Sequence, residues 1–499
     1  MFARFKSLLL ENRGTRQTIV KNVFWLSFGN IMSRVIRAGV IIYAARVLGA
    51  ADYGVFSYAL SLAAFFTVFG DIGLNAVLTR EVAQHPEERL TYFATSFWMK
   101  LVLLAGIALV IIFVAPALSN IDAVRPLIPL IALLTFFDSF REFGNSFLRA
   151  RERMEREAFV NITTNIVITG VGIGTLLFAV GVEPITIAYV VSTGVGALIG
   201  GFVLRDELRA IFTHVKVALM KPLIMASIPM ALIGLLGAFM LNTDMVMLAW
   251  WRPAAELGFY AAAQKIILVL YILPGIVGAA VFPAVSRLVS SDADRAKAGR
   301  LAERAMATLY FLAVPLAAGG IVLAEPIISF VFGAEYLPAA GAFRILCATL
   351  LIVFPGTLLG NLVLAYNRQK EVVWFVAAGG IGNILFNALL IPPFGIVGCS
   401  IATIIAQLVD NGAMWRFVKK ASNFRTLTHL KKIVPAGLLM AAVAFGLNAL
   451  HLHVLLTIAL SGIIYLGALA IFKENVIEQV KGLLAEARGT VSAAPIITE

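Results

Sequence analysis

The sequence has few charged residues and few cysteines. Only 14% of its 499 residues are charged, against about 25% in soluble proteins, and 60% are hydrophobic. These numbers exclude a soluble globular protein. Cys347 and Cys399 both lie inside apolar stretches, so the sequence predicts no disulfide framework. Walker A, G-x-S-x-G and H-E-x-x-H motifs are also absent, which argues against an NTP-driven pump or a hydrolase.

Long apolar runs fill most of the chain. A membrane-spanning helix needs about 20 apolar residues, and we find about fourteen such segments. The sequence therefore predicts an all-α, multi-pass membrane protein. The segments are 22–45, 54–78, 93–117, 126–148, 158–180, 185–204, 222–250, 257–283, 305–331, 339–365, 373–391, 396–415, 433–450 and 454–472.

The positive charge of the chain is distributed unevenly over its loops. The net charge is +12, and with a cytoplasmic N-terminus most Lys and Arg residues fall in cytoplasmic loops. Arg46, Arg125 and Arg252 are the exceptions that fall outside. We therefore expect both termini in the cytoplasm and expect no nucleic-acid partner, because the basic residues are accounted for by membrane topology.

A motif near the second segment returns near the eighth. AADYGVFSYA at 50–59 corresponds to AAELGFYAAA at 254–263. The sequence thus predicts two parallel six-helix repeats around a central cavity, followed by two further helices. The predicted divisions are a cytoplasmic tail, an N-lobe, a C-lobe, the last two spans and a second cytoplasmic tail, at 1–21, 22–214, 215–421, 422–472 and 473–499.

Several charged side chains fall inside the predicted spans, where each is costly unless it has a partner or a wet cavity. Asn30, Arg34 and Arg37 are spaced along one face of segment 22–45, so they could line a cationic cavity wall that binds an anionic head group. In the alternative interpretation the two arginines pair with Asp71 and Asp138.

The remaining charges within the spans have different predicted roles. Arg141 has Asp138 within one turn and is predicted to form a structural or gating ion pair with it. Lys265, next to Gln264, has no carboxylate three or four residues away, which favours a water-filled binding site. Lys100 and Arg344 lie nearer helix ends and are expected to extend to the membrane interface.

Three segments in the N-terminal part carry a family resemblance: ARVLG at 45–49, DYGVFS at 52–57 and DIGL at 71–74, with GFY at 258–260 as a second-half marker. With them the chain resembles the polysaccharide (O-antigen, Wzx-type) flippases of the multidrug/oligosaccharidyl-lipid/polysaccharide (MOP) exporter superfamily. The resemblance implies a transporter, not an enzyme. It would move an undecaprenyl-pyrophosphate-linked oligosaccharide to the outer leaflet by alternating access, for O-antigen, capsule or exopolysaccharide synthesis.

The resemblance also implies two sites. Arg34 and Arg37 match the helix 1 arginines of lipid II flippases, and Lys265 stands where those proteins have an arginine. A Na⁺ site is implied as well, although Asn387 stands where a carboxylate is usual. In the alternative interpretation, Asn383 and Asn387 form hydrogen bonds between helices. The residues of the Na⁺ site would be Asp244, Asn383, Asn387, Cys399 and Thr403.

Two alternatives remain open at this point. A MATE-like, cation-coupled multidrug antiporter should have an acidic cavity, and a membrane glycan polymerase or ligase should have a long outer loop. We expect no cofactor apart from a coupling Na⁺ or H⁺. The expected partners are lipid-linked oligosaccharide, membrane lipids and polysaccharide polymerase or glycosyltransferase machinery. The expected protein is a monomer in the bacterial inner membrane.

Overall fold

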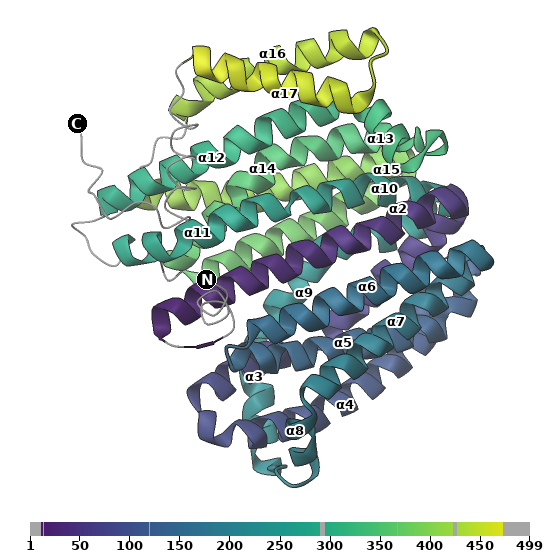
Figure 1. The fold of residues 1–499 in the computed structure, drawn as a ribbon, viewed down its shortest axis with the longest axis vertical. Coiled ribbons are helices and arrows are strands. Elements are labelled where there is room, and N and C mark those ends of the chain that lie inside the picture. The colour runs from purple at the N-terminus through teal and green to yellow at the C-terminus, as the bar shows by residue number, and fades with distance from the viewer. Residues whose placement is uncertain are drawn as a thin grey trace. The chain divides into compact units, whose positions relative to one another are not determined.

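The computed structural model describes residues 11–12, 14–118, 120–289, 295–366, 368–422 and 427–472, and these residues form helices and connecting turns with no strand among them. The prediction of an all-α fold is confirmed (Figure 1). In the N-terminal half the helices are α2 (Thr15–Phe69), α3 (Leu74–Gln84), α4 (Arg89–Val114), α5 (Ile128–Ala150), α6 (Met154–Phe178), α7 (Val182–Val203), α8 (Arg205–Leu208) and α9 (Met220–Trp251).

The helices of the C-terminal half follow in the same manner. They are α10 (Ala254–Leu270), α11 (Ile272–Val289), α12 (Arg295–Val322), α13 (Ala324–Phe332), α14 (Ala339–Ala365), α15 (Gln369–Ser422), α16 (Leu427–Ala449) and α17 (Val454–Ile471). Short 3₁₀ turns connect some of the helices, among them η3 (Asp122–Leu127) and η7 (Ala334–Tyr336).

Eleven helices in the described part of the chain, or up to twelve if a bent pair counts as one span, are long and apolar enough to cross a membrane. This finding confirms a multi-pass architecture. The count treats residues 370–420 as one span and joins α2 to α3 as the bent pair. The predicted number of fourteen therefore stays a prediction.

Two of the helices are far longer than one membrane crossing requires. A straight helix with the 55 residues of α2 would be about 80 Å long, whereas the hydrocarbon core of a bilayer is about 30 Å thick. Both α2 and α15 contain one glycine in a non-helical conformation: Gly49 with φ 75° and Gly395 with φ 55°. Positive φ is costly for residues with a Cβ, so each glycine allows the long helix to bend.

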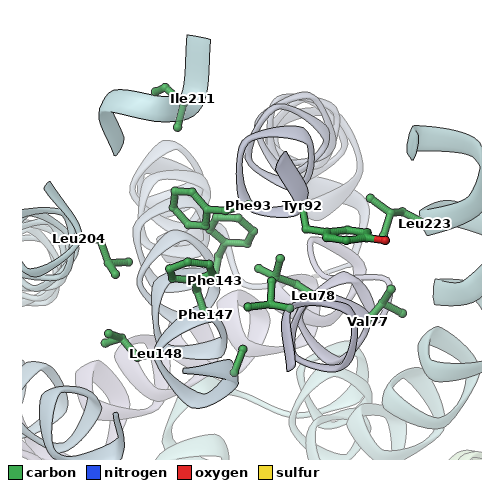
Figure 2. Close-up of a cluster of buried hydrophobic side chains, with 12 residues drawn as sticks. Val77, Leu78, Tyr92, Phe93, Phe143, Phe147, Leu148, Leu204, Ile211 and Leu223 are labelled. Carbon is green, nitrogen blue, oxygen red and sulfur yellow. The ribbon is translucent and has the colours of Figure 1, made fainter. Parts of the chain in front are cut away.

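The chain divides into two compact units. The first unit comprises residues 1–262, 331–336 and 383–399. Within it α2 packs along α6, α6 along α7, and α5 against α7 (Figure 1). An aromatic cluster lies between α3, α4 and α5, where the rings of Phe93, Phe143 and Phe147 lie together (Figure 2). This packing fixes α5, which carries Asp138, Arg141, Glu142 and Arg149, described below.

The second unit comprises residues 263–330, 337–382 and 400–499. Here α16 and α17 lie side by side and α16 packs against α12 (Figure 1). Tyr465 is buried in their apolar contact and donates a hydrogen bond to the carbonyl oxygen of Phe311 over 2.9 Å. The predicted lobe boundaries stay predictions, and the predicted tail at 473–499 and most of the tail at 1–21 lie outside the described residues.

Candidate functional site

Helix α2 presents the predicted cationic stripe. The side chains of Asn30 and Arg34 are exposed, and Arg37 is half-buried. Arg37 Nε donates a hydrogen bond to Asn165 Oδ1 on α6 over 2.7 Å. The partner of this guanidinium is thus a neutral amide. The assignment of Asn30, Arg34 and Arg37 to substrate binding stays a prediction.

Asp71 has a partner that the sequence did not indicate. Lys100 Nζ on α4 lies 3.0 Å from Asp71 Oδ1, and the Lys100 side chain is fully buried. The expectation that Lys100 extends to the membrane interface is therefore wrong. The Asp71 carboxylate lies within hydrogen-bond distance and offsets part of the cost of burying an ammonium group.

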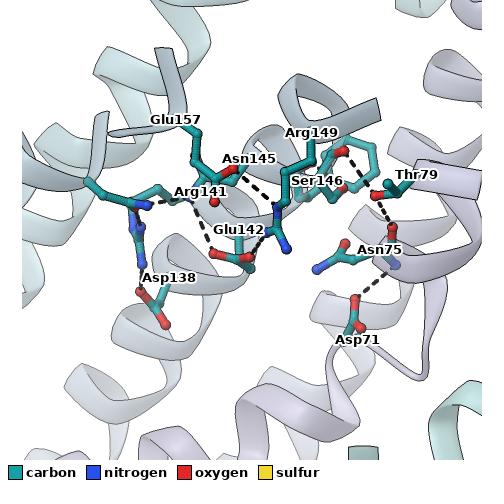
Figure 3. Close-up of polar contacts among 12 residues, drawn as sticks. Asp71, Asn75, Thr79, Asp138, Arg141, Glu142, Asn145, Ser146, Arg149 and Glu157 are labelled. Carbon is teal, nitrogen blue, oxygen red and sulfur yellow. Dashed lines mark hydrogen bonds and ion pairs between the residues drawn. The ribbon is translucent and has the colours of Figure 1, made fainter. Parts of the chain in front are cut away.

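Asp138 and Arg141 form the ion pair that their spacing predicts. Arg141 Nη2 lies 2.6 Å from Asp138 Oδ1 (Figure 3). Arg141 Nη1 also donates to Asn161 Oδ1 of α6. The Arg141 side chain is only 10% exposed. Asp138 therefore pairs closely with Arg141, and the gating role proposed for these residues stays a prediction.

One further arginine serves two carboxylates. Arg149 pairs with Glu142 of its own helix, and its Nε lies 3.3 Å from Glu157 Oε2 on α6 (Figure 3). Asn145 Nδ2 donates both to Glu142 Oε2, over 3.3 Å, and to Asn161 Oδ1, over 3.0 Å. These contacts join the Asp138–Arg141 pair to the Glu142–Arg149–Glu157 group. Sequence analysis missed this group because its members come from two helices.

The predicted ion-site residues of the first unit also lie together. Both amide groups donate to Asp244 Oδ1, Asn383 over 3.0 Å and Asn387 over 2.7 Å. Tyr260 donates to Asp244 Oδ2 over 2.7 Å, and buried Cys399 lies beside Asp244 and Tyr260. In this arrangement two amide N–H groups and one hydroxyl group donate hydrogen bonds to the carboxylate. The described residues contain no group of three or more His, Cys, Asp or Glu side chains that could hold a metal ion.

The other predicted site residues belong to the second unit. Gln264 and Lys265 lie on α10 and are half-buried, and Thr403 lies on α15. Their predicted roles in substrate and ion binding stay predictions.

The two copies of the repeated motif touch each other inside the first unit. A Cβ on Gly54 would overlap the carbonyl oxygen of Ala254, and a Cβ on Gly258 would overlap the carbonyl oxygen of Ala50. The contact is therefore reciprocal: each glycine faces the residue four positions before the other. Only glycine permits this approach of two helix backbones.

Residues of η7 contact the bend of α2 next to this crossing. The Ala50 backbone N–H donates to Glu335 Oε1 over 2.7 Å, and the buried Tyr336 hydroxyl donates to the Ala45 carbonyl oxygen over 2.8 Å. Burial raises the pKa of Tyr336, so its hydroxyl remains a donor at physiological pH. These contacts hold the bend at Gly49 in place.

The chain is similar in sequence to known proteins that are named as flippases or transporters. It is 22% identical to a Haloferax volcanii protein named as a probable low-salt glycan biosynthesis flippase, over 82% of this chain and 86% of that protein. It is 21% identical to a putative O-antigen transporter of Shigella flexneri, over 79% of this chain and 96% of the transporter.

Two solved structures have a similar fold. The lipid II flippase MurJ in an inward closed conformation gives a TM-score of 0.72 at 17% identity, covering 91% of this chain and 99% of that one. An inward-facing MATE transporter of the MOP superfamily gives a TM-score of 0.61 at 18% identity, covering 80% of this chain and 95% of the transporter. Residues 19–289, more than half of the chain, match the family described as polysaccharide biosynthesis protein. The chain, a multi-pass membrane protein with a MurJ- and MATE-like fold, belongs to this polysaccharide biosynthesis protein family.

Proposed function

We propose that the protein is a transporter, not an enzyme, that moves an undecaprenyl-pyrophosphate-linked oligosaccharide from the cytoplasmic to the outer leaflet by alternating access. The glycan would be an O-antigen, capsule or exopolysaccharide unit. Membership of the polysaccharide biosynthesis protein family and the relatives named as a flippase and as an O-antigen transporter support this proposal.

The observation that carries the proposal is the partner of Arg37. Its Nε donates to the neutral amide of Asn165, while Asp71 and Asp138 make their closest ion pairs with Lys100 and Arg141. A cation costs about 2.5–3.5 kcal/mol at the centre of a membrane helix on insertion scales. A pyrophosphate would offset that cost, and Arg34 and Lys265 would bind the same group, with Asn30 and Gln264 beside them.

The electrical driving force agrees with an anionic substrate. Moving one charge through 100 mV changes its free energy by about 2.3 kcal/mol, and a negative interior favours the outward movement of an anion. The arginines of α2 also disfavour the alternative, a MATE-like antiporter for organic cations, because such a cavity should be acidic.

The environment of the transporter is proposed on the same grounds. We place it as a monomer in the bacterial inner membrane, with both termini in the cytoplasm and with polysaccharide polymerase or glycosyltransferase machinery as partners. Asp244, Asn383, Asn387, Cys399 and Thr403 are proposed to bind a coupling Na⁺. Support for this site comes from the buried Asn387 Oδ1, which has no hydrogen-bond partner within the described part of the chain.

Export assays with cavity variants test the proposal. Arg37→Ala, Arg34→Ala and Lys265→Ala should each reduce glycan export at least tenfold, because each removes a charge from the proposed pyrophosphate site. Mass spectrometry should find the lipid-linked glycan accumulating in the inner leaflet. Arg37→Lys should retain part of the activity, because lysine keeps the charge but loses the bidentate geometry.

Arg344→Ala is the matched control. Arg344 pairs with Glu325 over 2.6 Å, and both side chains are well exposed, so its removal should leave export unchanged. Normal export by an Arg34→Ala/Lys265→Ala double variant that inserts at wild-type levels would contradict the assignment of the cavity.

A further inference from the structure

A continuous polar path connects Arg37 to the buried carboxylate of Glu157 in the first unit. Arg37 donates to Asn165, whose own Nδ2 donates to the carbonyl oxygen of Asn161 over 2.7 Å. The side chain of Asn161 accepts from both Arg141 and Asn145, and Asn145 also donates to Glu142. The path ends at Glu142, Arg149 and Glu157 (Figure 3).

The charges along this path balance, but they are not evenly placed. Its three cations are Arg37, Arg141 and Arg149, and its three carboxylates are Asp138, Glu142 and Glu157. Asp138 pairs with Arg141, and Glu142 makes the close pair with Arg149. The surplus cation, Arg37, therefore lies at one end of the path and the surplus carboxylate, Glu157, at the other.

Glu157 is held in surroundings that disfavour two ionised carboxylates. Its side chain is 7% exposed, and within the described residues its Oε2 has no hydrogen-bond partner, although Arg149 Nε is 3.3 Å away. The charged groups that face it are Glu142, Arg149 and Arg141, all on α5. When two carboxylates share one site, the ionisation of one opposes that of the other.

Among the described residues, the charged groups of α2 and α7 include Lys21 and Glu183. On α2, Lys21 pairs with Glu155 over 2.9 Å, so its charge is already used. On α7, which packs along α6, the titratable side chains are Glu183 in the first turn and the buried Tyr189. Glu183 lies at the start of α7, whereas the end of α7 adjoins the start of α6, where Glu157 lies.

We propose that Glu157, together with Glu142, forms a proton-binding site whose occupancy is coupled to anion binding at Arg37. This inference rests on the proposed function, because it takes a pyrophosphate as the ligand of Arg37. An anion at Arg37 makes the path net negative, and a proton that moves from water to a Glu157 carboxylate oxygen reduces this negative charge by one. The coupling is reciprocal, so protonation of Glu157 also strengthens anion binding.

The proton reduces the negative charge that accompanies each substrate molecule. When a proton is bound at Glu157, the binding of a pyrophosphate adds one negative charge fewer to the first unit than it adds without this proton. The cluster would thus load a proton together with its substrate.

Proton release and uptake can be measured directly on the purified full-length protein. Inorganic pyrophosphate is titrated into wild type in weak buffer, binding is measured by calorimetry, and a pH-indicator dye reports proton uptake. We expect about one proton to be taken up per pyrophosphate bound. Glu157→Gln should bind pyrophosphate without proton uptake, whereas Glu183→Gln, which removes an exposed carboxylate outside the path, should behave like wild type.

Infrared spectroscopy of the ligand-free protein provides a second readout that does not depend on pyrophosphate. Lowering the pH should produce the C=O stretch of a protonated carboxyl group, and this band should be missing from Glu157→Gln. Glu142→Gln should reduce the same band, because Glu157 then has Arg149 to itself. Because Glu157→Gln and Glu142→Gln both weaken this band, either variant can test the proton site if the other fails to fold.

The outcomes separate this inference from the proposed function. Pyrophosphate binding by wild type without proton uptake would overturn the coupled proton site and leave the pyrophosphate site intact. Failure of wild type to bind pyrophosphate would overturn the role of Arg37. The proton site would then be tested by infrared spectroscopy alone: a C=O band that is missing from Glu157→Gln supports it, and a band that is unchanged in this variant overturns it.

Discussion

At the scale of single residues, Asp244 shows how hydrogen bonds from neutral side chains can stabilise a carboxylate. It is buried and accepts hydrogen bonds from Asn383, Asn387 and Tyr260. Hydrogen bonds to a charged group contribute about 1.5–3 kcal/mol each. An ion would need oxygen atoms in place of these donors, and rotation of the two amides by about 180° would supply them, since an amide carries both atom types.

Sodium should therefore stabilise the protein only if these amides turn. We expect NaCl, compared with choline chloride at equal concentration, to raise the melting temperature of purified wild type. At 100 times its dissociation constant an ion adds about 2.7 kcal/mol. Asp244→Asn should remove the sodium effect, whereas Asp410→Asn, which changes a different buried aspartate, should keep it. Equal melting temperatures of wild type in the two salts would retire the ion site.

The residue scale also shows which contacts sequence could predict. Asp138 and Arg141 are three residues apart on one helix, so their ion pair follows from helical spacing alone. Lys100 lies on α4 and Asp71 in the turn between α2 and α3, so no local spacing joins them. The same limit hid Glu157 and Arg149, because the register of α6 against α5 depends on packing across the whole first unit.

At the scale of elements, apolar length predicts the helices well and their bends poorly. Each predicted span lies mostly on helical residues, since about 20 apolar residues in a membrane must satisfy their backbone groups internally, although the span 54–78 crosses the turn at 70–73. The bend in α2 depends on one residue, Gly49, within a continuous helix. Hydropathy gives no signal for such a bend, and neither does helical periodicity. Gly395 plays the same part in α15.

The crossing of the two motif copies gives a prediction at this scale. Gly54→Ala should destabilise the protein by at least about 1–3 kcal/mol, because the added methyl group overlaps the backbone of Ala254 and forces the two helices apart. Gly106→Ala is the matched control in α4, where a Cβ would meet nothing within 4 Å. It should be neutral or stabilise by about 0.5–1 kcal/mol.

Thermal unfolding in detergent measures both variants. The idea of a close crossing would be rejected if Gly54→Ala melted at or above the temperature of Gly106→Ala. Gly258→Ala should resemble Gly54→Ala, because the contact is reciprocal.

At the scale of the whole molecule, the surface is apolar where a soluble protein would be polar. Large side chains such as Phe113, Leu198 and Phe445 are 77%, 74% and 67% exposed. Exposed apolar patches of this kind would cause aggregation in water, and lipid chains provide the environment that they require. The fold class and the membrane were therefore predictable from composition, since they depend on the sum of many residues.

Loop charge predicts the orientation of the chain, and cysteine labelling tests it. Both native cysteines are buried, so they should react little with a maleimide that cannot cross membranes. In intact cells Glu183→Cys should be labelled, because the predicted topology places it outside. Asp206→Cys, at a well exposed position, should be labelled only after permeabilisation. The opposite pattern would reverse the predicted orientation.

The reciprocal contact of Gly54 and Gly258 also bears on the ancestry of the chain. Each glycine faces the residue four positions before the other, which is the self-complementary arrangement of an isologous two-fold interface. Two identical half-length chains could meet through the same surface. If the gene arose by duplication, this interface would be a remnant of a homodimer, now held within one polypeptide. The two motif copies could then diverge elsewhere, while neither could give up its glycine without a compensating change in the other.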